Sequence, residues 1–155
     1  MAPKSCHERA LGLLAARPRT RWELDQRLRR AGFEADEVAD VLARLEGVGL
    51  INDRDYAQTY AEHAFGVKHA GARAVTMALT SKGISRELVE EVTAQEPGQE
   101  YSRAADLASQ AAGRLRGLDQ PKAFGRLSAL LMRRGFSPET ARRAARQALQ
   151  VADPH

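Results

Sequence analysis

Cysteine and histidine are the residue types in this sequence that could supply nucleophilic or metal chemistry. Cys6 and His7 are adjacent and could form a nucleophile–base pair, but they lie near an N-terminus that we expect to fray. His63 and His69 are six residues apart, which is about 600° around a helix, so they do not share the face that a metal site needs. We therefore expect no catalytic residue and no metal site.

Phosphate-binding loops and paired carboxylates are the other signals of chemistry, and neither is convincing here. The segment Gly47-Val-Gly49 is followed by Leu-Ile-Asn-Asp, whereas a phosphate loop would continue with Lys and Ser or Thr. The adjacent acids Glu90 and Glu91 fall at positions that we expect on an exposed helix surface. The sequence thus predicts a binding protein that is not an enzyme and that needs no cofactor.

Arginine is the abundant side chain with binding chemistry. The chain has 24 Lys and Arg, of which 20 are Arg, against 20 acids, and its net charge is +4. The planar guanidinium group suits phosphate and carboxylate ligands. A GC-rich genome also raises Arg and Ala content, so the count alone does not predict a ligand.

The positive surplus lies in the last third of the chain. The formal charge is +1 for residues 1–52, −1 for 53–95 and +4 for 96–155. Arginines spaced three and four residues apart in the last segment share one side of a helix and suit phosphate or an acidic protein surface. The candidate contact residues are Arg126, Arg133, Arg134, Arg142, Arg143 and Arg146.

A solvated helix face explains this basic cluster equally well. It is the better explanation for the arginines between residues 17 and 30, which are diluted by Glu23 and Asp25.

Helical periodicity runs through the whole chain. Val38, Val41, Leu42 and Leu45 are spaced i, i+3, i+4 and i+7, which places them on one helix face. The segment Thr20–Glu23 is a capping box, in which the two side chains bond the first free amides of a helix. Because no alternating segment is long enough for a strand, the sequence predicts an all-α fold. Similar apolar stripes are Ala104, Leu107, Ala108, Ala111 and Leu115, and Ala141, Ala144, Ala145 and Ala148.

A glycine motif occurs three times, at Gly32, Gly83 and Gly135, with spacings of 51 and 52 residues. Each glycine has a leucine four residues before it, one or two basic residues among the three positions before it and an apolar residue directly after it. This pattern is typical of a helix that ends at a left-handed glycine, with the apolar residue folding back onto the helix.

A further helix is expected before each glycine turn, at roughly 5–16, 53–65 and 99–116. The sequence therefore predicts three tandem three-helix units of helix-turn-helix type that form an elongated, curved solenoid. The predicted units are residues 1–52, 53–95 and 96–155, with a joint at 95–99.

Helix-turn-helix units are also typical of sequence-specific DNA readers. The second helices here carry few Asn, Gln or Ser residues for base edges, so we do not expect base-specific reading, whereas phosphate contact stays open. No apolar run approaches the ~18 residues of a membrane span, and the N-terminus lacks the apolar core of a signal peptide. We expect a cytoplasmic monomer.

Four motifs follow one another in a fixed order. The longest is Gly49-Leu-Ile-Asn-Asp-Arg-Asp-Tyr-Ala57, and the others are Thr20–Leu24 with Leu28, Lys82–Ile84 and Arg133–Phe136. In this order and spacing, over about residues 8–150, they resemble the RecX family of regulators of the RecA recombinase. The corresponding family patterns are G-L-[IL]-[DN]-D-x-x-[FY]-A, a Ser or Thr cap followed by Glu-Leu, K-G-[IV], and two basic residues followed by Gly-[FY]. The chain departs from the family at Gly71-Ala72, where a proline usually follows the glycine and cations are more frequent.

The resemblance implies a non-enzymatic regulator of DNA repair and recombination. Such a protein binds the RecA filament on single-stranded DNA and inhibits its ATPase, strand exchange or filament extension. Single-stranded DNA is itself a further candidate partner. The alternative is a sequence-independent DNA- or RNA-binding helical module with no recombinase partner, and a purely structural adaptor is a third hypothesis.

The residues of the shared motifs have predicted structural roles. Asp53 is expected to cap a helix, and Leu50, Ile51 and Tyr56 are expected to pack between units. The full predicted structural set is Gly49, Leu50, Ile51, Asp53, Tyr56, Gly83 and Gly135.

Overall fold

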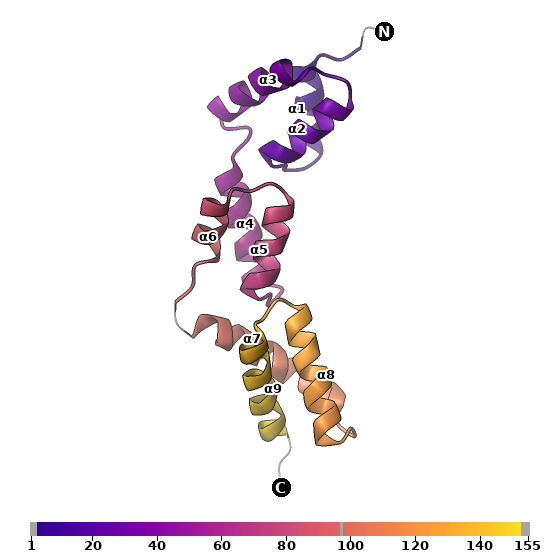
Figure 1. Ribbon diagram of the computed structural model, residues 1–155, viewed down its shortest axis with the longest axis vertical. Helices are drawn as coiled ribbons and strands as arrows, with labels where there is room; N and C mark the ends of the chain where they lie inside the picture. Colours follow the sequence, from indigo (N-terminus) through magenta and orange to yellow (C-terminus); the bar gives the residue numbers. More distant parts are fainter. Residues whose placement is uncertain (1–2, 97, 153–155) are drawn as a thin grey trace. The chain divides into compact units, whose positions relative to one another are not determined.

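The computed structural model describes residues 3–96 and 98–152 (Figure 1). Over these residues the chain is helical and contains no strand, which confirms the predicted all-α repeat fold. The predicted joint at 95–99 includes Pro97, which lies outside the described residues. The helices are α1 (Cys6–Ala16), α2 (Arg21–Arg30), α3 (Ala35–Gly47), α4 (Asp53–Gly66), α5 (Ala72–Ser81), α6 (Arg86–Thr93), α7 (Gln99–Ala112), α8 (Gln120–Arg133) and α9 (Pro138–Ala152).

Local sequence signals set most of the helix ends. The capping box of α2 is present, with the Thr20 hydroxyl accepting from the Glu23 amide and the Glu23 carboxylate accepting from the Thr20 amide, each at 3.1 Å. The third predicted leading helix is shorter than expected. The α-helix α7 ends at Ala112, and residues Gly113–Leu115 continue as a 3-10 turn, because glycine is a poor α-helix former and the last turn tightens.

The three predicted glycine turns are confirmed. Gly32, Gly83 and Gly135 have φ values of 101°, 79° and 101°. In each turn the amide after the glycine donates to the carbonyl of the leucine four residues before the glycine, at 3.1–3.2 Å. Gly49 forms a fourth turn of this kind, with φ 82° and a bond from the Leu50 amide to the Leu45 carbonyl. The turns therefore end α2, α3, α5 and α8 in the same way.

The chain folds into two compact units. The first contains the described residues of 1–59 and 79–89, and the second those of 60–78 and 90–155. The core of the first unit holds α1–α3 with Ile51, and the core of the second holds α7–α9. The predicted apolar stripes of α3, α7 and α9 are buried in these cores, while Leu115 is partly buried against the second core.

A junction between repeats lies inside the first unit. We call it the first junction; it joins the start of α2 to Asp53 and to the turn at Lys82–Gly83. The Arg21 amide donates to the Asp53 carboxylate at 2.9 Å, and the buried Thr20 hydroxyl donates to the Lys82 carbonyl at 2.6 Å. A Cβ on Gly83 would lie 2.2 Å from the Cβ of Trp22, so only glycine fits.

The second junction has the same plan and lies inside the second unit. The start of α5 meets Glu100 and the turn at Arg134–Gly135. The Ala72 amide donates to the Glu100 carboxylate at 3.2 Å, and the Gly71 amide donates to the Arg134 carbonyl at 2.7 Å. The two junctions thus share one plan. A carboxylate from the first turn of α4 or α7 accepts the first amide of α2 or α5, which is the second helix of the repeat before. A glycine turn packs beside this capped helix start.

Two Gly→Ala substitutions should have opposite effects on stability. At Gly32 no neighbouring atom would clash, but its φ of 101° strains an L residue, so Gly32→Ala should lower the free energy of unfolding by about 1–2 kcal/mol. Gly12 lies exposed inside α1 with open space around it, so Gly12→Ala should raise that free energy by about 0.5–1 kcal/mol. Urea titration followed by circular dichroism measures both. Equal effects at the two positions would contradict the assigned turn.

Candidate interaction surface of the third repeat

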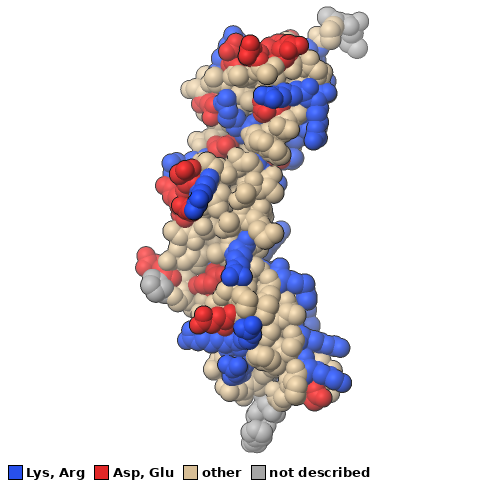
Figure 2. Space-filling view, in the orientation of Figure 1, with Lys and Arg blue, Asp and Glu red and all other residues tan. Residues whose placement is uncertain are grey.

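The outer faces of α8 and α9 carry most of the predicted contact residues. Arg126 and Arg133 are seven residues apart on α8, about 20° from two full turns, so they lie on one helix face. On α9, Arg142, Arg143 and Arg146 are exposed opposite the alanine stripe, whose four members are at most 7% exposed. On the face that Figure 2 shows, the surface of the third repeat carries more Lys and Arg (blue) than Asp and Glu (red).

Two of the α9 arginines lie over aromatic rings of the neighbouring helices. The guanidinium carbon of Arg143 is 4.1 Å from the ring centroid of Tyr101 on α7, and that of Arg146 is 5.6 Å from the ring centroid of Phe124 on α8. These cation–π contacts hold the two charges against the helix bundle. Arg126, Arg133 and Arg142 have no such contact among the described residues.

No carboxylate of residues 3–96 and 98–152 forms an ion pair with any of these five exposed arginines. Their charge is therefore available to a partner. We call Arg126, Arg133, Arg142, Arg143 and Arg146 the basic face.

Arg134, the sixth predicted contact residue, is placed differently. It is only partly exposed, its guanidinium donates to the Lys68 carbonyl, and its own carbonyl accepts the Gly71 amide. Both bonds belong to the second junction. Arg134 therefore holds the turn before α5, and the structure does not group it with the basic face.

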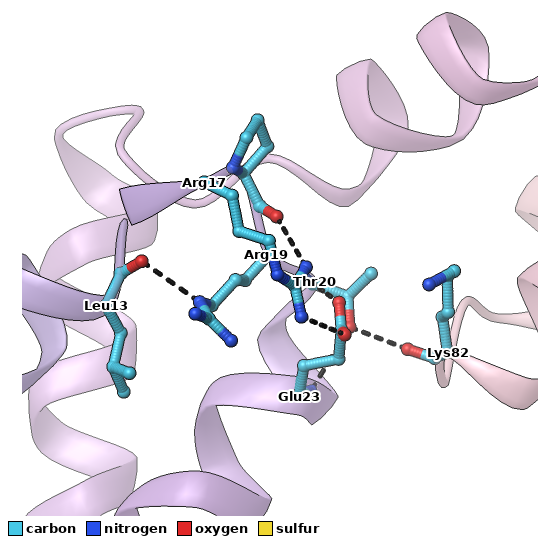
Figure 3. A network of polar contacts seen from close by, with 7 residues as sticks. Leu13, Arg17, Arg19, Thr20, Glu23 and Lys82 are labelled. Atoms are coloured by element: carbon cyan, nitrogen blue, oxygen red, sulfur yellow. Dashed lines mark hydrogen bonds and ion pairs between the residues drawn. The ribbon is translucent and has the colours of Figure 1, made fainter. Parts of the chain in front are cut away.

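Several arginines of the first repeat are engaged within the chain, and Figure 3 shows two of them, Arg17 and Arg19, with their partners. Arg17 pairs with Glu23 at 3.3 Å, Arg21 pairs with Glu46, and Arg29 pairs with Asp25 at 3.3 Å. These three ion pairs contrast with the basic face, whereas the exposed Arg9, Arg27 and Arg30 form no described ion pair.

Arg19 is buried and donates through Nε to the Leu13 carbonyl at 3.0 Å. Burial lowers the pKa of its guanidinium, and the positive charges of Arg17 and Arg27 lower it further. Burial alone would raise the pKa of the Glu23 carboxyl, but hydrogen bonds from the Thr20 amide and the Arg17 guanidinium outweigh it, and the pKa is lowered.

The cysteine is not a reactive group. Cys6 is the first residue of α1 and is 1% exposed, so the expectation that it frays is wrong. Burial raises the pKa of its thiol, and the negative charge of Glu37 adds to the rise, which opposes formation of a nucleophilic thiolate. Within the described part of the chain, no three His, Cys, Asp or Glu residues gather as metal ligands, and no helix is long and apolar enough to cross a membrane.

The predicted motif residues have mixed outcomes. Ile51 is buried in the core of the first unit, whereas Leu50 is 53% exposed, so its predicted packing between units is wrong. The Leu50 amide returns to α3 while its side chain turns to solvent. Asp53 does cap a helix, but that helix is α2; the Asn52 side chain, which accepts the Asp55 amide at 3.1 Å, caps α4. Burial raises the pKa of Asp53 despite the bond from the Arg21 amide.

Comparison with known proteins agrees with the repeat plan along the chain. Three family models match in order: the first three-helix domain of RecX at residues 6–45, the second at 52–92 and the third at 99–145. The regulatory protein RecX of Streptomyces coelicolor (strain ATCC BAA-471 / A3(2) / M145) is 37% identical over 141 residues, which cover 90% of this chain and 75% of that protein. That of Mycobacterium sp. (strain KMS) is 35% identical over 143 residues, covering 89% and 78%.

The chain belongs to the RecX family. A crystal structure of RecX from Lactobacillus salivarius has the same fold, with a TM-score of 0.80 and 23% identity over 94% of this chain and 95% of that one.

Ala72, the first residue of α5, has a main-chain role in the second junction. The Ala72 amide donates to Glu100, and a proline has no such donor. Arg103 supports the same carboxylate: it bonds Glu100 at 2.5 Å and the Ala70 carbonyl at 3.2 Å, and its guanidinium carbon lies 4.3 Å from the Phe65 ring centroid. Burial lowers the pKa of Arg103, although the charge of Glu100 opposes this.

Glu100 and Arg103 were missed by sequence reasoning. An acid in the first turn of α7, with an arginine three residues later, was the available signal.

The two acids of the first junction should respond to pH with opposite signs. Because the folded pKa of Glu23 is lowered, its contribution to stability is present above its ordinary pKa of 4.5 and is lost as pH falls through the lower folded value. Glu23→Gln should therefore lower the free energy of unfolding by about 1 kcal/mol at neutral pH. The difference from wild type should vanish in acid.

Asp53→Asn is the matched comparison, because the folded pKa of Asp53 is raised and its ionised form costs stability. The variant keeps an oxygen acceptor for the Arg21 amide and should be no less stable than wild type at neutral pH. Any gain should shrink as pH falls through the raised pKa. Urea titrations across the acid range measure both variants, and a large neutral-pH loss in Asp53→Asn would show that the carboxylate charge is required.

Proposed function

We propose that this RecX-family chain binds the RecA recombinase filament on single-stranded DNA and limits its ATPase, strand exchange or extension. It would act as a monomeric, non-enzymatic regulator of DNA repair and recombination in the cytoplasm, where its partner works. The observation that carries the proposal is the basic face itself, five exposed arginines on the two packed helices α8 and α9. The first repeat pairs Arg17, Arg21 and Arg29 with its own acids, whereas the basic face has no ion pair among the described residues.

The placement of the basic face suits a polyanionic filament. Its arginines lie on two helices that pack on one alanine-rich core, so their spacing is set by helix geometry. Guanidinium groups bind phosphate and carboxylate in a forked geometry, which suits both DNA and acidic protein surfaces. Charge complementarity of this kind raises association rates and fixes register on the partner.

A titration of the RecA DNA-dependent ATPase tests the proposal. Substoichiometric protein should suppress ATP hydrolysis and strand exchange, because one regulator bound to a filament affects many protomers. If an excess of the folded protein leaves both rates unchanged, RecA is not its target.

The variant Arg126→Glu/Arg133→Glu/Arg142→Glu should weaken inhibition at least tenfold. These exposed side chains make no described ion pair or cation–π contact, so their reversal should not unfold the bundle. Arg9→Glu/Arg27→Glu/Arg30→Glu is the matched control, since it makes the same charge change at exposed sites of the first repeat. Equal losses in the two variants would point to net charge rather than to the basic face.

A nucleic-acid-binding module with no recombinase partner is the second candidate, because phosphate could equally occupy the basic face. Gel shifts on a single-stranded oligonucleotide at several salt concentrations separate the two. Tight, steeply salt-dependent binding to naked nucleic acid, without an effect on RecA, would favour this second function.

A further inference from the structure

A shallow groove runs along the second junction, beside the basic face. Its floor is formed where the Gly135 turn meets α5 at Ala74, and its volume is about 420 Å³. A Cβ on Gly135 would lie 2.4 Å from the Cβ of Ala74, so the close approach that builds the floor depends on glycine. The lining residues are Arg73, Ala74, Met77, Met132, Arg133, Gly135, Phe136 and Pro138.

Two methionines give the groove an apolar, adaptable surface. Met77 on α5 is 73% exposed and Met132 on α8 is 37% exposed, so both side chains face solvent in the free chain. Methionine has three rotatable bonds and a polarisable sulfur, and exposed methionines are common where a protein binds apolar side chains of varied shape. Their exposure beside a groove favours a binding surface over core packing.

Charge decides what kind of partner the groove suits. Arg73 and Arg133 line it, both are exposed, and neither has an ion pair among the described residues. No acidic residue is among the described lining residues. The groove is therefore complementary to a ligand that is acidic at its edges and apolar at its centre.

A protein segment fits these features better than a nucleic acid does. Single-stranded nucleic acids bind by stacking bases on exposed aromatic rings. The aromatic side chain of the described lining, Phe136, is 1% exposed and offers no such platform. Acidic residues interspersed with leucine-like residues would satisfy both the arginines and the methionines.

We propose that the groove lined by Met77 and Met132, with Arg73 and Arg133 at its rim, binds an acidic segment of a protein partner that inserts apolar side chains between the two methionines. This groove shares Arg133 with the basic face, so the inference rests on the proposed function and adds a protein segment as the ligand of that surface. Its test needs no RecA, so the two can fail separately.

Methyl NMR of the full chain labelled with [13C-methyl]methionine tests the groove directly, because the sequence has only three methionines. Met77→Leu and Met132→Leu variants assign the two groove signals. The probe is a 15-residue peptide of Glu with Leu at every third or fourth position. It should shift the Met77 and Met132 methyl signals saturably, with an affinity that weakens as salt is added.

Three control ligands discriminate the alternatives: a Gln/Leu peptide, a Glu/Ala peptide and a 15-nucleotide oligo(dT). Each should bind at least tenfold more weakly at the methionine signals. Equal shifts with Gln/Leu would remove the role of charge, equal shifts with Glu/Ala would remove the apolar insertion, and equal shifts with oligo(dT) would make the groove a phosphate site. Any of these results, or no shift with the Glu/Leu peptide, would overturn the proposal.

Arg73→Glu/Arg133→Glu should weaken binding of the Glu/Leu peptide about tenfold, since two favourable rim pairs become repulsive. Arg9→Glu/Arg27→Glu is the control of equal charge change and should leave the affinity within twofold. Circular dichroism confirms that both variants stay folded. An unchanged affinity in the folded Arg73→Glu/Arg133→Glu variant would contradict the assigned rim.

Discussion

The start of a helix leaves backbone amides without acceptors. In this chain a carboxylate from the next repeat accepts the first of these amides, and this hydrogen bond joins one repeat to the next. The first amide of α2 is bonded by Asp53, and the first amide of α5 is bonded by Glu100. Both acids come from the first helix of the following repeat, within its opening turn. A glycine turn of that same repeat then packs beside the capped end. Much of each junction is therefore built from main-chain groups and one carboxylate.

This arrangement explains why similar arginines end in different states. Near the first junction, Arg17 and Arg19 are drawn into the network around Glu23 and the carbonyl of Leu13. At the second junction, Arg103 and Arg134 are used in the same way. The arginines on the outer faces of α8 and α9 form no ion pair with a described acid. Position relative to the junctions, more than abundance, determines which cations are available to a partner.

The sequence predicted the features that depend on near neighbours. The capping box at Thr20 and the glycine turn at Gly135 are each encoded within a few residues, so pattern reading suffices. The roles of Glu100 and Arg134 depend on residues 28 and 66 positions away, and their local sequence is that of any helix end. The predicted packing of Leu50 was wrong for a related reason. Its hydrophobicity predicts burial, yet the turn that contains it directs the side chain outward, and only the backbone geometry reveals that.

The long sequence separation of the junction bonds has a kinetic consequence. Helices and glycine turns form from local contacts, whereas the Thr20–Lys82 and Arg134–Lys68 bonds close loops of 62 and 66 residues. Loop closure costs entropy that is repaid only when the repeats are already shaped, so these bonds belong to the last step of folding and the first step of unfolding. Loss of a junction bond then mainly accelerates opening and leaves the rate of helix assembly nearly unchanged. The long-range bonds of Thr20 and Arg134 would thus set how long each junction stays closed.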